Sequence, residues 1–339
     1  MWNAPATLAM VGFLMAVAQA HSAAPAQPPT AAPVERSISG FKPVATIQVG
    51  KTADWVAITG DAVWVGSTSP NAVHRIDPDT NREAASVSVP GEPCAGLVPG
   101  FGSLWVPLCA AKPALARIDL RSNRLVTVLG FGTAAECGIT ASEDSVWLVV
   151  DNHGTLARID PAKASIRQTV KLPPGSCNPH YSEGVVWVTN AKGAELTAVD
   201  ASSGAIVATI KTGPHPRFLT DGAGSIWTLN QGDGSLTRID MRSRRALGSI
   251  ALGTPGHGGD IAFGSLYVWT TMAGTPLTLV EPALDGESGV GTLFRQFVGD
   301  GGDSLAIGHG AIWLTDYHKG TIARYPIAEA ASPFCCLSP

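Results

Sequence analysis

A motif that returns about every forty residues constrains this chain more than any other feature. It reads GDAVWVGSTSPNAVHRIDPDTNREAASVSV at its first occurrence and AGSIWTLNQGDGSLTRIDMRSRRALGSIAL at its fifth. Each copy holds four short stretches typical of strands, with Gly, Asn, Asp and Pro at the joins, which is the signature of a β-propeller blade. The aromatic markers of the seven copies are Trp64, Trp105, Trp147, Trp187, Trp227, Tyr267 and Trp313.

Seven markers predict an all-β protein, a seven-bladed β-propeller of four-stranded antiparallel blades. The last copy stops after TIARYPI, its third strand, whereas the other copies continue into a fourth. FKPVATIQVG, residues 41–50, stands alone ahead of the first copy and has the alternation of a strand. We expect this N-terminal strand to join the last blade and close the ring, with Thr46 and Gln48 on one face of the pleat.

The two ends of the chain lie outside the repeat. Residues 1–20 read as a signal peptide, because an apolar run too short to span a bilayer precedes Ala18-Gln19-Ala20. Residues 21–40 are expected to be a Pro/Ala-rich linker, residues 41–328 the propeller and residues 329–339 a C-terminal tail. We therefore expect a periplasmic or secreted protein with no transmembrane segment after signal removal.

Charge and cysteine content narrow the function further. The net charge is −4 with 15% charged residues, so no basic excess suggests a nucleic-acid partner. Six cysteines follow the signal, and in an oxidising compartment an even number favours disulfides.

The positions of the cysteines suggest particular pairs. Cys94 and Cys109 lie equidistant from the turn at residues 99–102 and can face one another across that hairpin, and Cys137 and Cys177 can then bridge neighbouring blades. The alternative is a copper or zinc site of three thiolates, because Cys94, Cys137 and Cys177 share one phase of the repeat. Cys335-Cys336 lies past the last repeat and is open to a vicinal bridge, a bond to another chain or free thiols.

The repeat resembles two related propeller families over nearly the whole mature chain. VWVTNAKGAELTAVDASSGAIVATIKTG is similar to the YVTN-type repeat, and the recurring GSIW…LTRID is similar to streptogramin B (virginiamycin B) lyases. The resemblance implies the fold much more specifically than the chemistry, because propellers carry many functions.

The lyase resemblance also implies a site, which this sequence does not retain. Such lyases are magnesium-dependent and use two histidines and two glutamates in the last two blades. The histidine positions fall here on Gly259 and Asp303, and the glutamate positions on Gly301 and Tyr317. His257 lies two residues before the first histidine position, and Asp316 lies beside the last glutamate position.

One face of the ring gathers the residues suited to binding or chemistry. It is formed by the start of each inner strand and the loop between each second and third strand. The residues expected to bind a ligand there are Arg217, Asp260, Asn230 and Trp55. The residues expected to act if the protein is an enzyme are His257, Asp303, Tyr317 and His318, with Asp303 and Asp316 as metal ligands.

The sequence therefore predicts an exported propeller that binds a small molecule or a protein partner at the mouth of its channel. The alternative is a lyase or hydrolase that uses Mg²⁺ or another divalent cation, with His257 or His318 as base. Whether the protein is catalytic, and whether it has any cofactor, stays open at this point.

Overall fold

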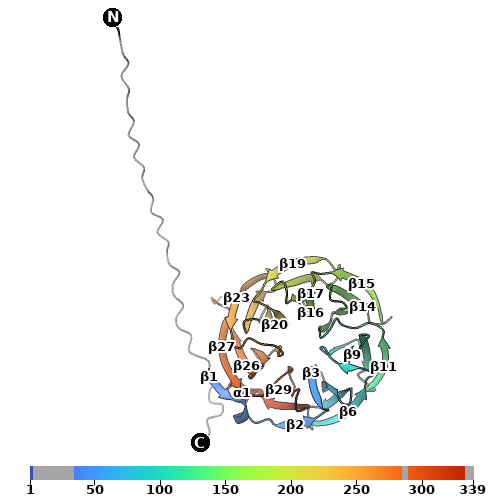
Figure 1. Cartoon of the computed structure of the whole chain (residues 1–339). Helices are drawn as coiled ribbons and strands as arrows, with labels where there is room; N and C mark the ends of the chain where they lie inside the picture. Colours follow the sequence, from blue (N-terminus) through green and yellow to red (C-terminus); the bar gives the residue numbers. More distant parts are fainter. Residues whose placement is uncertain (3–33, 285–288, 333–339) are drawn as a thin grey trace. The chain divides into compact units, whose positions relative to one another are not determined.

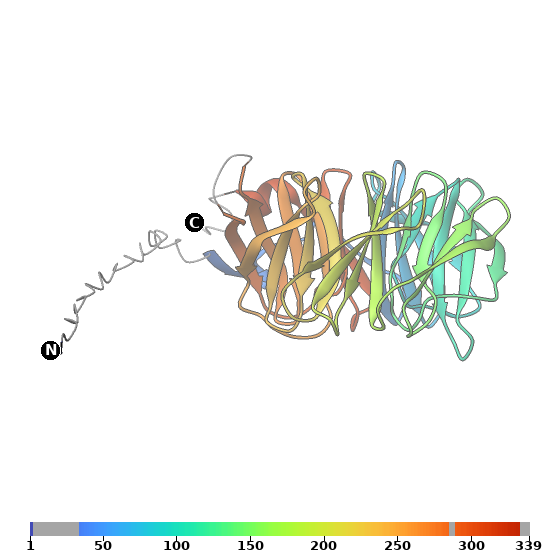
Figure 2. The same ribbon diagram turned by 90° about the horizontal axis from the view of Figure 1, so that it is seen from above.

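The structure is a computed structural model that describes residues 1–2, 34–284 and 289–332. From Val34 onward the described residues form a ring of seven antiparallel sheets around a central channel (Figures 1 and 2). The prediction of an all-β, seven-bladed propeller is confirmed. Among the described residues, no helix has the length and apolarity that a bilayer crossing demands.

The strands run from the channel outward in each blade (Figure 1). Blades one to three contain β3 (Thr52–Thr59), β4 (Ala62–Thr68), β5 (Ala72–Asp77) and β6 (Arg82–Ser88); then β7 (Glu92–Pro93) with β8 (Val98–Gly100), β9 (Ser103–Cys109), β10 (Ala114–Asp119) and β11 (Arg124–Leu129); then β12 (Ile139–Ala141), β13 (Val146–Val149), β14 (Thr155–Asp160) and β15 (Ser165–Lys171).

Blades four and five are regular. They contain β16 (Ser176–Ser182), β17 (Val185–Asn190), β18 (Glu195–Asp200) and β19 (Ile206–Lys211); then β20 (Pro216–Gly222), β21 (Ser225–Asn230), β22 (Ser235–Asp240) and β23 (Arg245–Ala251).

Blades six and seven take one strand each from the N-terminal segment. They contain β24 (Asp260–Gly264), β25 (Tyr267–Met272), β26 (Thr275–Pro282), β27 (Gly291–Val298) and β1 (Val34–Ser37); then β28 (Leu305–Gly308), β29 (Ala311–Asp316), β30 (Thr321–Pro326) and β2 (Ala45–Gln48).

β2 closes the ring as the sequence predicts. It pairs antiparallel with β30, from Ala45 opposite Arg324 to Gln48 opposite Thr321. Thr46 and Gln48 are the exposed members of the alternation, and the Gln48 amide donates to the carbonyl oxygens of Lys319 and Gly320. The edge of the last blade is thereby covered by the start of the same chain.

The N-terminal segment is ordered further back than the expected linker boundary. Val34–Ser37 form β1, which pairs in parallel with β27 of blade six, and Ile38–Gly40 form a short 3₁₀ helix, η1. Phe41 follows, with its ring centroid 4.8 Å from that of Phe297 and 4.8 Å from that of Tyr325. The segment from Val34 to Gln48 is thus a strap that joins the outer edges of blades six and seven.

A short helix, α1 (Ile327–Ala331), follows β30 and occupies the boundary expected between propeller and tail. Ala330 is buried, and its carbonyl oxygen accepts a 2.6 Å hydrogen bond from Nη1 of Arg295 in blade six. The start of the expected tail therefore packs against the ring.

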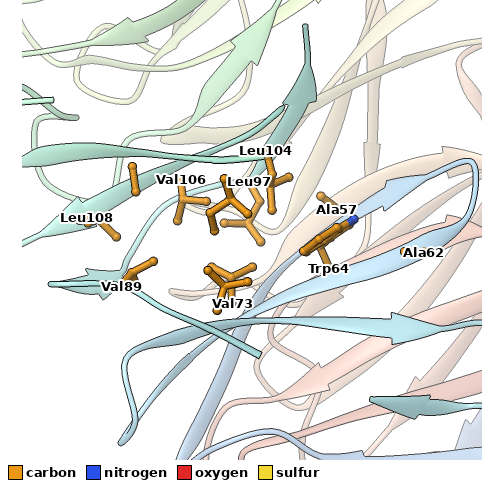
Figure 3. Packing of buried hydrophobic residues seen from close by; sticks show 12 residues of the cluster. Ala57, Ala62, Trp64, Val73, Val89, Leu97, Leu104, Val106 and Leu108 are labelled. Carbon is orange, nitrogen blue, oxygen red and sulfur yellow. The ribbon is translucent and has the colours of Figure 1, made fainter. Parts of the chain in front are cut away.

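Each hydrophobic cluster lies between two blades. The cluster in Figure 3 joins Ala57, Trp64 and Val73 of blade one to Leu104 and Leu108 of blade two. Each blade has one fully buried tryptophan that packs against a neighbouring blade. Tryptophan is suited to this position because its side chain is large and has a single polar group, the indole N–H, that requires a hydrogen-bond partner. In blade three, Arg158 is buried beside this tryptophan, with its guanidinium carbon 5.1 Å from the centroid of the Trp147 ring.

The marker of blade six is Trp269, and the prediction of Tyr267 was wrong. Trp269 is fully buried, and its Nε1 donates to the carbonyl oxygen five residues earlier, Gly264, as Trp227 does to Gly222. The hairpin between β25 and β26 has a register shift, which displaces the sequence spacing in this blade.

Candidate functional site

Three inner strands, β3, β16 and β20, change register where they begin, and the shifts in β3 and β20 concern the candidate site. In β3 the pairing shifts between Asp54 and Val56, so Trp55 is the extra residue and has a φ of 59°. In β20 the pairing shifts between Pro216 and Phe218, so Arg217 is the extra residue. A β-bulge turns a side chain out of the regular alternation, and such bulges are frequent beside functional sites.

These bulges lie at a cavity of about 240 Å³, which we call the mouth cavity. Its lining comes from blades one, three, five, six and seven and consists of Asp54, Trp55, Glu136, Arg217, Phe218, Gln231, His257, Gly258, Gly259 and Asp303. A smaller hollow of about 40 Å³ adjoins it through Asp54, Trp55 and Glu136, and is also lined by Glu92, Cys94 and Tyr317. The mouth cavity therefore combines aromatic and ionisable side chains contributed by separate blades.

The aromatic part of the cavity connects blade one to blade five. The ring centroids of Trp55 and Phe218 lie 6.0 Å apart and the rings are tilted by 58°. Trp55 packs against the cluster between blades one and two and also against the cluster between blades five and six. It thus reaches across the channel rather than packing within its own blade.

Arg217 is held by contacts with two neighbours. Its guanidinium carbon lies 5.6 Å from the centroid of Phe218. Its Nη2 donates to the carbonyl oxygen of Glu136 at 3.2 Å and lies 3.6 Å from the carboxylate oxygen Oε2 of the same residue. The positive charge of Arg217 is therefore already matched by Glu136.

Asp54 has the most perturbed carboxyl group of the cavity. Burial raises its pKa to about 7, although a 2.8 Å hydrogen bond from its neighbour's backbone N–H, that of Trp55, lowers it. The negative charges of Asp260, Asp303 and Glu136 raise the pKa further. A carboxyl that titrates near neutral pH in a cavity is a marker of a functional site.

Asp303 shares this environment. Burial raises its pKa, the N–H of Tyr317 lowers it through a 2.6 Å hydrogen bond to Oδ2, and the charge of Asp316 raises it. Burial also raises the pKa of the Tyr317 hydroxyl, as do the charges of Glu92 and Asp54. The whole mouth is therefore an electronegative region with few compensating cations.

Four of the sequence-predicted residues meet in the mouth cavity, namely Trp55, Arg217, His257 and Asp303. Tyr317 lines the adjoining hollow. Within the described residues, no side chain or backbone group hydrogen bonds to the ring of His257, which is exposed. Two of the predicted ligand-binding residues, Trp55 and Arg217, therefore lie in the same region as three of the predicted catalytic residues, His257, Asp303 and Tyr317.

The remaining predicted residues lie elsewhere. Asn230 is fully buried inside blade five, where its amide donates to Ser235 and Thr237. The carboxylate of Asp260 accepts from the hydroxyl of Ser304 at 2.6 Å and so joins blades six and seven. Neither side chain lines the mouth cavity, and burial raises the pKa of Asp260 to about 6.

Asp316 and His318 also lie outside the lining of the mouth cavity. Asp316 lines a separate groove of about 590 Å³ beside the strap and accepts a 2.6 Å ion-pair hydrogen bond from Lys319. The exposed ring of His318 contacts Tyr317 edge-on, with centroids 5.6 Å apart. Among the described residues, no group of three or more His, Cys, Asp or Glu side chains is arranged to hold a metal.

Sequence reasoning missed Asp54, Glu136, Phe218 and Gln231 as cavity residues. All four lie in the inner-strand starts and loops assigned to the working face, but nothing in the spacing distinguished them. A signal was present at Asp54, because it directly precedes an aromatic residue at the mouth in ADWVAIT.

The two predicted disulfides are confirmed. Cys94 and Cys109 are bonded across the first hairpin of blade two, with Cα atoms 5.5 Å apart. Cys137 and Cys177 join blades three and four, with Cα atoms 4.8 Å apart. The alternative thiolate metal site is wrong, because its three cysteines are all in disulfides. Cys335 and Cys336 lie outside the described residues.

Comparisons with known proteins support the propeller fold but do not assign the chain to a family. No protein-family model matches the chain, and no curated protein matches its sequence. The crystal structure of BamB from Moraxella catarrhalis is similar with a TM-score of 0.60 and 12% identity, over 85% of this chain and 98% of that chain. The structure of U3-55K is similar with a TM-score of 0.71 and 9% identity, over 86% of this chain and 99% of that chain. At these identities the likeness supports the propeller fold alone.

Proposed function

We propose that this protein is an exported propeller that binds a small molecule, or a side chain of a partner protein, in the mouth cavity. The observation that carries the proposal is the meeting of Trp55, Arg217, His257 and Asp303 from four blades around one cavity of about 240 Å³. Concave sites with apolar walls and a few convergent polar groups are the usual places for ligands.

Export is supported by two features. The first twenty residues read as a signal peptide, and two disulfides brace the channel mouth. Structural disulfides persist in oxidising compartments, which favours the periplasm or the cell exterior.

Binding, rather than streptogramin elimination, is favoured by the residues at the positions that the lyase resemblance implies. Gly259 and Asp303 occupy the histidine positions and both line the mouth cavity. Gly301 and Tyr317, at the glutamate positions, line the groove beside the strap and the smaller hollow respectively. Neither of the two histidines and neither of the two glutamates is retained.

A second candidate function is favoured by one observation, the pKa of about 7 at Asp54. A general acid or base works best with a pKa near the working pH, so a lyase or hydrolase is the alternative. The version with a divalent cation such as Mg²⁺ requires Asp303 and Asp316 as ligands and His257 or His318 as base. Metal analysis of the natively purified protein tests it: stoichiometric metal that is lost in Asp303→Ala or Asp316→Ala would favour the enzyme.

The binding proposal is tested with a panel of small probes of different charge, whose binding is followed by isothermal titration and by the difference in tryptophan emission between wild type and Trp55→Ala. We expect at least one class to bind the wild-type protein with a one-to-one ratio and to lose affinity in Trp55→Ala. Asp151→Asn is the matched control, because Asp151 lies on a loop of the same face outside the cavity and caps its own turn. Binding that is unchanged in Trp55→Ala would contradict the proposal.

A further inference from the structure

We propose that the mouth cavity is selective for an organic monocation, an alkylammonium or alkylguanidinium group, whose charge is met by the carboxylates of Asp54 and Asp303. This inference rests on the proposed function, because it names the ligand class of the same cavity.

The charges that line the cavity do not cancel. Asp54, Glu136 and Asp303 contribute three carboxylates, whereas Arg217 contributes one fixed cation. Arg217 is engaged with Glu136 through the 3.2 Å hydrogen bond and the 3.6 Å ion-pair contact. The carboxylates of Asp54 and Asp303 are therefore left without a cationic partner among the lining residues.

One oxygen of Asp54 is available to such a ligand. Oδ1 accepts the N–H of Trp55, while Oδ2 accepts no hydrogen bond from the described residues. Asp54 lines both the mouth cavity and the smaller hollow, so it lies where the two spaces meet. Asp54 is half-buried, and a half-buried carboxylate with a free oxygen in a cavity is stabilised by a donor that also carries positive charge.

The aromatic side chains favour the same class of ligand. Trp55 presents a ring to the cavity beside the carboxylates, and Arg217 already lies over the face of Phe218 at 5.6 Å. Tryptophan is the side chain with the strongest cation–π attraction, which increases when the site is dry. The small volume excludes a large ligand, so a short alkyl chain with one cationic end fits best.

Affinity for a cation must then depend on pH. The groups that act on Asp54 are Asp260, Asp303 and Glu136, which disfavour its ionised form, and the N–H of Trp55, which favours it. Arg217 and His257 also line the cavity, as do Glu92 and Tyr317 in the adjoining hollow. A bound cation favours the ionised carboxylate, so binding strengthens as pH rises through about 7.

The experiment is isothermal titration at pH 6 and pH 8 with four probes of similar length: n-butylammonium, n-butylguanidinium, 1-pentanol and butyrate. We expect the two cations to bind and to bind about tenfold more tightly at pH 8 than at pH 6. Asp54→Asn should weaken cation binding at pH 8 about tenfold and remove most of the pH dependence. Asp303→Asn should weaken it as well, and Asp151→Asn should leave it unchanged.

A further arm distinguishes the two sources of such a group. N-acetyl-lysine methylamide that binds as tightly as n-butylammonium would indicate a lysine of a partner protein, whereas exclusion of the peptide would indicate a free amine. Either result supports the cation site.

Results that contradict the cation inference alone differ from results that also contradict the proposed function. Binding of butyrate or pentanol without the cations would overturn the cation inference and leave a ligand cavity, as the proposed function requires. Cation binding that is equal in Asp54→Asn and Asp303→Asn, with circular dichroism showing both variants folded, would overturn it too. Binding of none of the four probes would count against both proposals.

Discussion

Trp55 of blade one and Phe218 of blade five lie with their ring centroids 6.0 Å apart, although their positions in the chain differ by 163. Trp55 is the extra residue at the register shift of β3, and Phe218 directly follows the extra residue of β20; Trp55 also has a backbone conformation that a bulky residue rarely adopts. The contact closes one side of the mouth cavity and depends on every blade between them. The mouth cavity therefore forms only when the blades are assembled into the closed ring.

Asp54→Asn should stabilise the protein at alkaline pH. The folded protein raises the pKa of this carboxyl to about 7, above its ordinary value near 4, so the folded state binds the extra proton between those values. Stability contributed by the protonated group is present below about pH 4 and is lost as pH rises through about 7. The side chain of the Asp54→Asn variant does not ionise, so the variant does not lose stability in this way as pH rises.

We expect the variant to exceed wild type by at least about 1 kcal/mol at pH 8 and to match it near pH 4. Urea unfolding at both pH values measures the difference. A variant that is less stable than wild type at pH 8 would show that Asp54 is ionised and well compensated in the folded state.

Phe41→Ala should detach the strap from the ring. Phe41 is buried between Phe297 and Tyr325, and truncation of a buried phenylalanine costs about 3–5 kcal/mol. Val44→Ala is the matched control, because Val44 lies in the same segment and is exposed. Thermal unfolding of both variants tests the strap, and equal midpoints would mean that Phe41 contributes nothing beyond an exposed residue.

Trp187→Phe should cost less stability than Trp227→Phe. The indole N–H of Trp227 donates to the carbonyl oxygen of Gly222, whereas Nε1 of Trp187 is buried with no partner among the described residues. In blade four the hydroxyl of Ser182 donates to Asp221 instead. Loss of a satisfied donor leaves its acceptor unpaired, so the two variants should differ by about 1 kcal/mol in chemical unfolding. Equal losses would indicate that Trp187 has an acceptor in solution.

Removal of the Cys137–Cys177 disulfide should loosen blades three and four. The bond spans 40 residues, and a loop of that length contributes about 4 kcal/mol in the chain-entropy account. The paired variant Cys137→Ser with Cys177→Ser should lower the unfolding midpoint, and reduction of the wild type, which also breaks Cys94–Cys109, should lower it at least as much. Non-reducing peptide mapping is the direct check: a Cys94 peptide linked to Cys177 would contradict the pairing.

The ring architecture was predictable because the same sequence motif recurs in each blade. The repeat gives the blade count, and the missing fourth strand of the last copy identifies residues 41–50 as the closing strand. β1 was not predictable, because VERS is four residues long and pairs in parallel outside any repeat. Trp269 was misplaced by two residues, because the register of the following hairpin departs from the other blades.

The site was predictable only in part. Phase in the repeat places Trp55, Arg217, His257 and Asp303 at one end of the channel. It does not reveal the side-chain direction, which is why Asn230 was expected at the mouth although it satisfies its amide inside blade five. The raised pKa of Asp54 depends on a cavity to which four other blades contribute residues. No local sequence pattern indicates which residues meet across a ring.

The most direct test of a ligand site at the channel mouth is the indole N–H signal of Trp55 in a two-dimensional NMR titration with n-butylammonium at pH 8, assigned with Trp55→Phe. We expect a saturating shift of the Trp55 signal, while the signals of the buried tryptophans between the blades, such as Trp147 and Trp313, do not shift. An unmoved Trp55 signal, or equal shifts of the buried tryptophans, would contradict a ligand site at the channel mouth.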